Sequence, residues 1–418
     1  MARLNDLEPR VGAPLAGTRV VVDVRPLQEP ERVPITAGYL GNLMEAFTSA
    51  PLAGESFVMV LRTLRDDPSR SWQDRGLPIA GRRHLPPTRV LRSAGLTLDS
   101  FLLRGAEVGA GAGARDGGAA GTVYHSAGGA VPLGSRLPVV ATLLDLAPWE
   151  LPDVYARSPA ARFGHRLRAR VLRDAARLIV PSKAMAEAAR RRFHVDPERI
   201  ALVPLAADDE YSPGASAELD LLRRRLALPD RYLVFAGRYD ARKDFATLFE
   251  ALRALRDASA DRGAAPRIVL AGAGGPDDIS ALGRAASRSG VDDLVVLTPR
   301  LSPDDLATII AGSRGFVYPA LSEGTGQGVA EALATAVPVI ASKVGPLPEI
   351  VGGAGIVVEP RDAKRLAAAI RSLWWNDGLY EQLRRVAESR TREPRRTWLD
   401  VAQETRAVYA AAVRADDG

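Results

Sequence analysis

Short apolar runs alternate with helical patterns through the first half of the chain. Residues 38–47 have the composition of a helix that opens at Gly38. The apolar runs have the length of strands and lie at residues 19–24, 57–61, 122–125 and 138–143. Strands that are apolar along their whole length are typical of a parallel sheet with helices on both faces. The pattern therefore predicts an α/β domain in this half.

A second series of apolar runs follows residues 208–214, a polar stretch whose proline and glycine are typical of a domain linker. Helical segments separate these runs, which lie at residues 232–236, 267–271, 294–297, 315–318, 337–341 and 355–358. Two doubly wound halves predict an α/β fold with two Rossmann-like domains that face each other across a cleft. Ligands of such sheets bind beyond the carboxyl ends of the strands, so we expect the site in that cleft.

Residues 105–121 form a segment dominated by glycine and alanine. The segment contains no Gly-x-Gly-x-x-Gly spacing, which a dinucleotide-binding turn would require. We therefore expect a flexible surface loop here.

Length and composition narrow the class of protein. The chain has 418 residues, which is long for one hydrophobic core, so two domains are expected. It has no cysteine and no basic N-terminus followed by an apolar stretch. No apolar run approaches the roughly 20 residues that span a bilayer. These features predict a cytoplasmic protein without disulfides or thiolate-bound metal.

The charge balance is basic but does not favour nucleic acid as a partner. The 56 basic residues outnumber 50 acidic ones, and only four of them are lysines. Acidic residues are interspersed among the arginines, and no basic stripe carries the interleaved aromatic residues that bind single strands. We therefore expect no nucleic-acid partner.

Two glutamates border one glycine-rich turn in the second half. Glu323 follows the predicted strand at 315–318, and Glu331 lies on the predicted helix at 327–335. The first N–H groups of a helix have no partner within it, so they can hold a phosphate or a sugar hydroxyl. Both carboxylates can face the same cleft, which indicates a nucleotide-sugar site. The alternative is a solvated helix entry.

An earlier turn in the same predicted sheet carries two cations. Arg238 and Lys243 follow the predicted strand at 232–236 and can both reach a phosphate at that turn. Arginine offers a planar fork to phosphate oxygens and lysine a compact charge, so together they can stabilise a diphosphate leaving group. Lys243 is accordingly expected to be an exposed turn charge. The alternative is that both are solvated turn residues without a ligand.

The second half resembles the C-terminal domain of the retaining, GT-B-fold glycosyltransferases of family four. The resemblance is carried by residues 237–243, 301–306, 319–324, 331–332, 337–342 and 345–350. Residues 139–148 and 176–183 extend it more weakly into the first half, and the helical segment after Trp398 resembles the family's closing helix. We accordingly place an acceptor-binding domain at residues 1–207, a nucleotide-sugar-binding domain at 208–395 and a returning helix at 396–418.

The resemblance implies a role for each matched residue. Arg238 and Lys243 would bind the donor diphosphate, Glu331 the ribose hydroxyls, and Glu323 would face the transferred sugar. The turn between the glutamates would hold sugar hydroxyls or phosphate through Gly324, Thr325, Gly326, Gln327 and Gly328. The implied reaction moves a hexosyl group from a GDP-, UDP- or ADP-sugar to a hydroxyl of a glycan, a lipid-linked acceptor or a small molecule, with retention.

Several positions depart from the family pattern. Thr325 stands where the family usually has an aromatic residue, and Ala336 where it usually has glycine. Leu144 replaces a histidine that contacts the sugar in many members. Asp145 remains a candidate contact in that turn, and His125 ends a neighbouring strand, where a lone histidine is more often structural. Gly38 is the single glycine kept from the family's usual N-terminal pair and is the candidate for close approach to acceptor or phosphate.

No visible feature requires a metal or a further cofactor. The chain contains no Asp-x-Asp, and its four histidines come without cysteines. With arginine, lysine and helix dipoles near the phosphates, metal-independent transfer is the expectation. The rival functions are a nucleotide-sugar epimerase, a phosphorylase and a non-catalytic module that binds sugar nucleotides or glycans.

A basic amphipathic pattern lies between the two series of strands. Its arginines recur at helical spacing beside an apolar stripe of Phe163, Leu167 and Val171, and they are Arg162, Arg166, Arg170, Arg173 and Arg177. Such a helix can attract anionic lipid, which would place the protein peripherally at the inner membrane face. The alternative is a solvated face on a packed helix.

Overall fold

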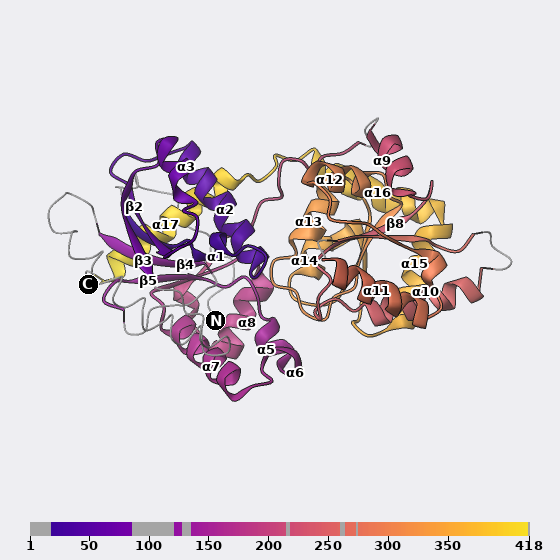
Figure 1. Cartoon of the computed structure of the whole chain (residues 1–418), viewed down its shortest axis with the longest axis horizontal. Coiled ribbons are helices and arrows are strands. Elements are labelled where there is room, and N and C mark those ends of the chain that lie inside the picture. Colours follow the sequence, from indigo (N-terminus) through magenta and orange to yellow (C-terminus); the bar gives the residue numbers. More distant parts are fainter. Residues whose placement is uncertain are drawn as a thin grey trace. The chain divides into compact units, whose positions relative to one another are not determined.

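The computed structural model describes residues 18–85, 121–127, 135–214, 218–259, 264–272 and 275–416. The chain divides into two compact units (Figure 1). Unit 1 consists of Met1–Leu205 and Thr397–Gly418, and unit 2 of Ala206–Arg396. Of the glycine-rich segment expected as a loop, only Gly121 lies within the described residues.

The described strands of unit 1 form one parallel sheet in the order β3-β2-β1-β4-β5-β6-β7. They are β1 Arg19–Asp23, β2 Ser56–Arg62, β3 Ile79–Leu85, β4 Thr122–Ala127, β5 Val139–Thr142, β6 Arg177–Val180 and β7 Ile200–Leu202. The central strands are buried on both faces because helices cover both sides of the sheet. The strands predicted in this half are confirmed.

Three strands lie outside the predicted apolar runs. β6 falls within residues 176–183, which carried the weaker resemblance, and β3 and β7 lie at the two edges of this sheet. β3 carries Arg82, Arg83 and His84, which reach solvent at least in part. β7 contains three residues. An edge strand needs no continuous apolar run because one of its sides faces no other strand.

Within the described residues, the helices of unit 1 are α1 Arg25–Gln28, α2 Pro34–Ser49, α3 Ser69–Asp74, α5 Ala147–Glu150, α6 Pro152–Tyr155, α7 Pro159–Asp174, α8 Lys183–Phe193 and α17 Trp398–Asp416, with a 3₁₀ turn at Pro197–Arg199. The predicted start of the helix at Gly38 was wrong. α2 begins at Pro34, because proline lacks the N–H that a first helical residue leaves unpaired. Gly38 therefore lies inside the helix, where it is exposed.

The C-terminal helix α17 packs on unit 1 beside α2 and against β4, β5 and β6 (Figure 1). Arg406 on this helix forms a buried two-pronged ion pair with Glu55, at 2.9 and 2.8 Å. Gly121 lies so close that an added Cβ would come within 2.2 Å of Val413. Among the described helices, none combines the length and the apolar character needed to cross a bilayer.

The described strands of unit 2 form a second parallel sheet in the order β10-β9-β8-β11-β12-β13. They are β8 Leu233–Gly237, β9 Ile268–Gly272, β10 Val295–Leu297, β11 Gly315–Tyr318, β12 Val339–Ser342 and β13 Gly355–Val358. The strands predicted in this half are confirmed. Phe235 on β8 and Phe316 on β11 both stack on Tyr318, and all three rings belong to the buried core of this unit.

The helices of unit 2 are α9 Glu218–Leu226, α10 Phe245–Asp257, α11 Pro276–Arg288, α12 Pro303–Ala311, α13 Gln327–Ala334, α14 Leu347–Val351, α15 Ala363–Trp375 and α16 Asp377–Thr391, with 3₁₀ turns at Asp292–Leu294 and Gly352–Ala354. The stretch expected as a linker packs on this unit. Tyr211 is buried, and the backbone carbonyls of Asp208 and Tyr211 accept hydrogen bonds from Arg395.

Candidate active site

The strand order of unit 2 places the candidate site. β8 and β11 are neighbours, and the chain continues from β8 to β9 on one side and from β11 to β12 on the other. Ligands of doubly wound sheets bind beyond the carboxyl ends of the strands at such a switch point. The turns that follow these two strands, residues 237–244 and 319–328, are the ones that carry the predicted donor residues.

Backbone hydrogen bonds join these two turns. Asp244 N–H donates to the Pro319 carbonyl at 3.0 Å, and Leu321 N–H donates to the Arg242 carbonyl at 2.7 Å. Lys243 and Ala320 thereby form an antiparallel bridge. Backbone hydrogen bonds therefore hold the two turns side by side, although they are about 80 residues apart in sequence.

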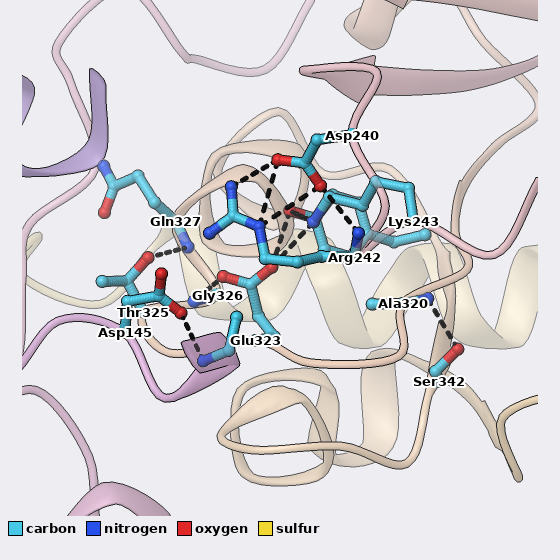
Figure 2. Close-up of polar contacts among 12 residues, drawn as sticks. Asp145, Asp240, Arg242, Lys243, Ala320, Glu323, Thr325, Gly326, Gln327 and Ser342 are labelled. Atoms are coloured by element: carbon cyan, nitrogen blue, oxygen red, sulfur yellow. Dashed lines mark hydrogen bonds and ion pairs between the residues drawn. The ribbon is translucent and has the colours of Figure 1, made fainter. Parts of the chain in front are cut away.

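Lys243 and Glu323 form a buried ion pair, with 2.8 Å between Nζ and Oε2 (Figure 2). The Tyr318 hydroxyl donates to the same carboxylate oxygen at 2.9 Å, and the lysine ammonium lies 3.9 Å from the centre of the tyrosine ring. The other carboxylate oxygen accepts the N–H of Gly326 at 3.2 Å. Both oxygens of Glu323 therefore have partners.

The burial of Lys243 corrects the prediction that it is an exposed turn charge. Its side chain is 5% exposed and that of Glu323 is 7% exposed. Lys243 points inward because the bridge to Ala320 brings its backbone alongside the turn that carries Glu323. A charge is stable in such surroundings only beside an opposite charge with good hydrogen bonds.

The surroundings hold Glu323 in its ionised form. Burial alone would raise the pKa of its carboxyl group, but the charge and hydrogen bond of Lys243, helped by Arg242, lower this pKa to about 2. Burial and the neighbouring carboxylate raise the pKa of Tyr318, so its hydroxyl keeps the proton that it donates.

Two glycines are needed to shape the turn around Glu323. Gly326 precedes α13 with φ of +65°, and a Cβ there would lie 2.3 Å from Ile350 Cδ1. Gly345, after β12, has φ of +49°, and a Cβ there would lie 2.0 Å from the Glu323 carbonyl oxygen. Only glycine combines this backbone conformation with such close approach.

The other residues of the predicted turn have structural contacts of their own. The side chain of Gln327 donates to the Ala206 carbonyl at 2.9 Å, and its N–H lies 3.4 Å from the Thr325 hydroxyl oxygen. Gly324 is buried, as is Thr325. Gly328 lies in the first turn of α13, where a Cβ would meet Tyr318 at an ordinary distance of 3.6 Å.

Glu331 lies on α13 in a setting unlike that of Glu323. Burial raises the pKa of its carboxyl group to about 8, and the charge of Asp208 adds to this effect, against hydrogen bonds from Gln327 and Tyr211 that lower it. Residue 331 is half-buried. The structure therefore brings Lys243 and Glu323 into contact, whereas Glu331 belongs to a separate cluster with Tyr211.

Two residues near the ion pair did not emerge from the sequence. Arg242 forms a two-pronged ion pair with Asp240, at 3.0 Å from Nε and 2.6 Å from Nη2 to Oδ2 (Figure 2). The adjacency of Arg242 to Lys243 in the sequence was the signal that could have identified it as a site residue. Gly345 lies in a matched segment, but its approach to Glu323 could not be foreseen from spacing. Arg238, which follows Gly237, is half-buried.

The remaining predicted residues lie in unit 1. Asp145 Oδ1 accepts a hydrogen bond from the N–H of Ala147, the first residue of α5, at 2.8 Å. A Cβ on Gly38 would meet no atom within 4 Å.

Leu144 and His125 are both buried in unit 1. The His125 ring nitrogens lie 2.9 Å from the Thr142 hydroxyl and 2.8 Å from that of Tyr409. Burial lowers the pKa of His125 to about 3, so this histidine is neutral and links α17 to β5.

The described residues contain no group of three or more His, Cys, Asp or Glu side chains arranged to hold a metal ion.

Two family models match the chain. The one described as glycosyl transferases group 1 matches residues 230–376, and the one described as glycosyltransferase family 4 matches residues 119–211. The chain belongs to glycosyltransferase family 4. The first match contains both joined turns, and the second contains Asp145 and the strands beside it.

Curated relatives of this family 4 chain match it over part of their length. The O-antigen chain mannosyltransferase B of Escherichia coli is 32% identical over 181 residues, which are 43% of this chain and 46% of that protein. A D-inositol 3-phosphate glycosyltransferase of Streptomyces bingchenggensis strain BCW-1 is 32% identical over 247 residues, which are 57% and 53%. The chain thus spans about half the length of these relatives.

Solved structures match the family 4 chain almost from end to end. An Anabaena protein in complex with UDP and glucose has a TM-score of 0.66 at 16% identity, covering 92% of this chain and 97% of that one. A likeness at this identity shows the fold, which is the GT-B fold with two parallel α/β sheets. The predicted fold class and family are confirmed.

Proposed function

We propose that this chain transfers a hexosyl group from a nucleoside diphosphate sugar to an acceptor hydroxyl with retention of configuration. The observation that carries the proposal is the buried Lys243–Glu323 pair at the switch point of unit 2, beside the N-terminus of α13. It joins a phosphate-binding cation to a fully ionised carboxylate in the segment that matches the glycosyltransferase family.

The chemistry assigns a separate task to each group. When the bond between the anomeric carbon and the phosphate breaks, its electron pair stays with the diphosphate, whose added charge Arg238 and Lys243 stabilise. Glu323 faces the electron-poor anomeric carbon. The acceptor oxygen bonds to that carbon and passes its proton to the oxygen of the departing diphosphate. Fixed cations and a helix N-terminus supply the leaving-group stabilisation, so we propose that no divalent metal is needed.

Glu331 is assigned to the nucleoside. In the donor-free protein its carboxyl group is protonated near neutral pH, because its pKa is raised to about 8, and it is hydrogen-bonded to Tyr211 and Gln327. Two ribose hydroxyls that donate to this group would favour its ionised form. The base and the sugar are left open, so UDP-, GDP- and ADP-sugars are the candidates.

We assign acceptor binding to unit 1. Asp145 follows β5 and Gly38 lies in the helix after β1, both beyond the carboxyl ends of their strands. The open space over Gly38 lets a ligand approach the α2 backbone closely. The acceptor class is a glycan, a lipid-linked sugar or a small molecule with a free hydroxyl.

We also propose contact of α7 with an anionic membrane surface. Phe163 is 57% exposed and is surrounded in sequence by the exposed Arg162, Arg166 and Arg170. Arg177, grouped with them by spacing, lies instead on β6, since α7 ends at Asp174. Residues 157–199 contain 12 Lys and Arg but four Asp and Glu, an excess of 8 that is larger than the net charge of +6 for the whole chain.

The function is tested by a panel of UDP-, GDP- and ADP-sugars. Thermal shift identifies the donor that stabilises the protein, and nucleotide release is then measured with and without candidate acceptors. Acceptor-dependent release that continues in EDTA supports a metal-independent transferase. Binding without release under every acceptor favours the binding module, and release that EDTA abolishes and Mg²⁺ restores overturns the metal-independent part.

A further inference from the structure

We infer that Glu323 is an internal anion which occupies the phosphate-binding groups of the donor-free protein, and that an incoming diphosphate must displace it. This inference rests on the proposed function, because it concerns the same site. It adds an order of events, in which phosphate first takes Lys243 and only then leaves the Glu323 carboxylate free for the sugar.

The contacts of the Glu323 carboxylate are those expected of a bound phosphate. One oxygen accepts the lysine ammonium of Lys243 at 2.8 Å. The other accepts the N–H of Gly326, the residue that caps the N-terminus of the eight-residue helix α13, at 3.2 Å. A lysine and the first amides of a helix are the groups that proteins use to hold phosphate oxygens. One side chain therefore occupies two of the donors that a diphosphate would use.

The neighbouring cation, Arg242, is also paired with a carboxylate of the protein. Arg242 contributes to the ionisation of Glu323 but is itself paired with Asp240 through both of its side-chain prongs. The Tyr318 hydroxyl completes the enclosure by donating to Glu323 at 2.9 Å. A diphosphate that approaches this turn therefore competes with carboxylates that already hold the cations.

Competition has a consequence that a purely structural ion pair would not have. If Glu323 competes with phosphate, removing its charge while keeping its size must strengthen diphosphate binding. If Glu323 instead holds Lys243 in a position from which it binds phosphate, the same change must weaken binding. The two roles therefore predict opposite signs for Glu323→Gln.

The first experiment measures the Kd of inorganic pyrophosphate and of UDP, GDP and ADP by calorimetry for the parent chain and for E323Q. We expect E323Q to bind pyrophosphate about tenfold more tightly, which corresponds to removing one competing charge-assisted contact. E359Q is the matched control, because Glu359 pairs with Lys343 at the surface at 2.9 Å. Unchanged or weaker binding by folded E323Q overturns the inference.

A second experiment follows the NMR signal of Lys243 in the parent chain, so the site itself is not changed by substitution. The chain has four lysines, Lys183, Lys243, Lys343 and Lys364, so the ¹³Cε signals of labelled lysine are few enough to assign. Pyrophosphate is expected to shift the Lys243 signal and to leave that of Lys343 in place. A Lys243 signal that does not move at saturating pyrophosphate contradicts displacement.

Failure of this inference can be told apart from failure of the proposed function. If E323Q binds diphosphate more tightly and transfers sugar at the parent rate, displacement stands and the catalytic role of Glu323 fails. If E323Q loses transfer while its diphosphate affinity stays at the parent value, the catalytic role stands and displacement fails.

Discussion

At the scale of single residues, Lys243 and Glu323 bury two opposite charges together. Each is stable because the other is present, and each would be an uncompensated charge alone. The ion pair between Lys343 and Glu359 has a similar length of 2.9 Å, but its side chains are 60% and 50% exposed. Water can therefore replace either partner. The chain thus contains a buried pair and an exposed reference for it.

The first prediction is that Lys243→Met lowers the free energy of unfolding by about 3–5 kcal/mol, because it leaves the Glu323 carboxylate buried without a counter-charge. The K243M/E323Q double variant should recover a large part of that loss. Urea denaturation of the full chain measures both effects. The exposed pair should show a coupling below about 1 kcal/mol in the K343M/E359Q cycle. A K243M variant as stable as the parent would contradict the buried charge pair.

The second prediction concerns the pH dependence given by Glu331. Its pKa is raised in the folded state to about 8, above an unfolded value near 4.5, so its protonated form is favoured by folding. The stability that this protonation contributes is complete below about pH 4.5 and is lost as the pH rises through 8. The glutamine side chain of the Glu331→Gln variant does not titrate, so the variant does not lose this stability as the pH rises. The Tm of E331Q relative to the parent should therefore rise by a few degrees between pH 5 and pH 8.5, and a constant difference would contradict the raised pKa.

At the scale of elements, the turns after β8, β11 and β12 fit together through contacts that each involve backbone atoms. The antiparallel bridge joins the first two turns, and Ala320 N–H donates to the Ser342 hydroxyl at the end of β12, at 2.9 Å. Gly345 lies against the Glu323 carbonyl. The position of the Glu323 carboxylate is therefore set by three separate segments of chain.

The third prediction is that Gly345→Ala lowers transfer by at least about tenfold, because the new Cβ and the positive φ together displace the Glu323 backbone. Gly283, inside α11, is the matched control, since a Cβ there meets Leu297 at 3.4 Å without a positive φ. G283A should keep the parent rate. Steady-state kinetics on the cognate donor compare the two, and a G345A variant with the parent kcat would remove Gly345 from the site.

The sequence was sufficient to predict the strands that are buried on both faces. Strands such as β8 and β12 are apolar along their length because helices cover both faces, and their runs predict them directly. Edge strand β3 was missed because three consecutive polar residues, Arg82, Arg83 and His84, interrupt its apolar run. Residue types also predicted Lys243 and Glu323 as partners of a ligand. Their contact with each other was not predictable, because it depends on a bridge between turns about 80 residues apart.

At the scale of the whole molecule, positive charge is uneven. The basic segment from 157 to 199 includes α7 and α8. The exposed side chain of Phe163 on α7 is an apolar group that can insert into a lipid surface. Anionic lipid attracts such a segment by about 1 kcal/mol for each basic residue near the surface, and a buried aromatic ring adds to this.

The fourth prediction is that the R162E/R166E variant loses most of its binding to vesicles that contain anionic lipid, whereas R253E/R371E binds like the parent. Arg253 and Arg371 are exposed on α10 and α15 of unit 2, which makes them a control for total charge. Sedimentation with vesicles at several salt concentrations measures the effect, which should weaken as salt rises. Equal losses in the two variants would indicate a response to net charge alone. Binding to nucleic acid in preference to vesicles would contradict the membrane assignment.

The central claim is that the ionised Glu323 carboxylate acts on the sugar of a nucleoside diphosphate donor. The most direct measurement is the kcat for acceptor-dependent nucleotide release by E323Q and by E359Q, on the donor that stabilises the parent chain. We predict that E323Q loses at least about a hundredfold in kcat, because it keeps the size of the side chain but removes the charge that faces the anomeric carbon. E359Q should match the parent. Parent-rate release by folded E323Q would contradict the account.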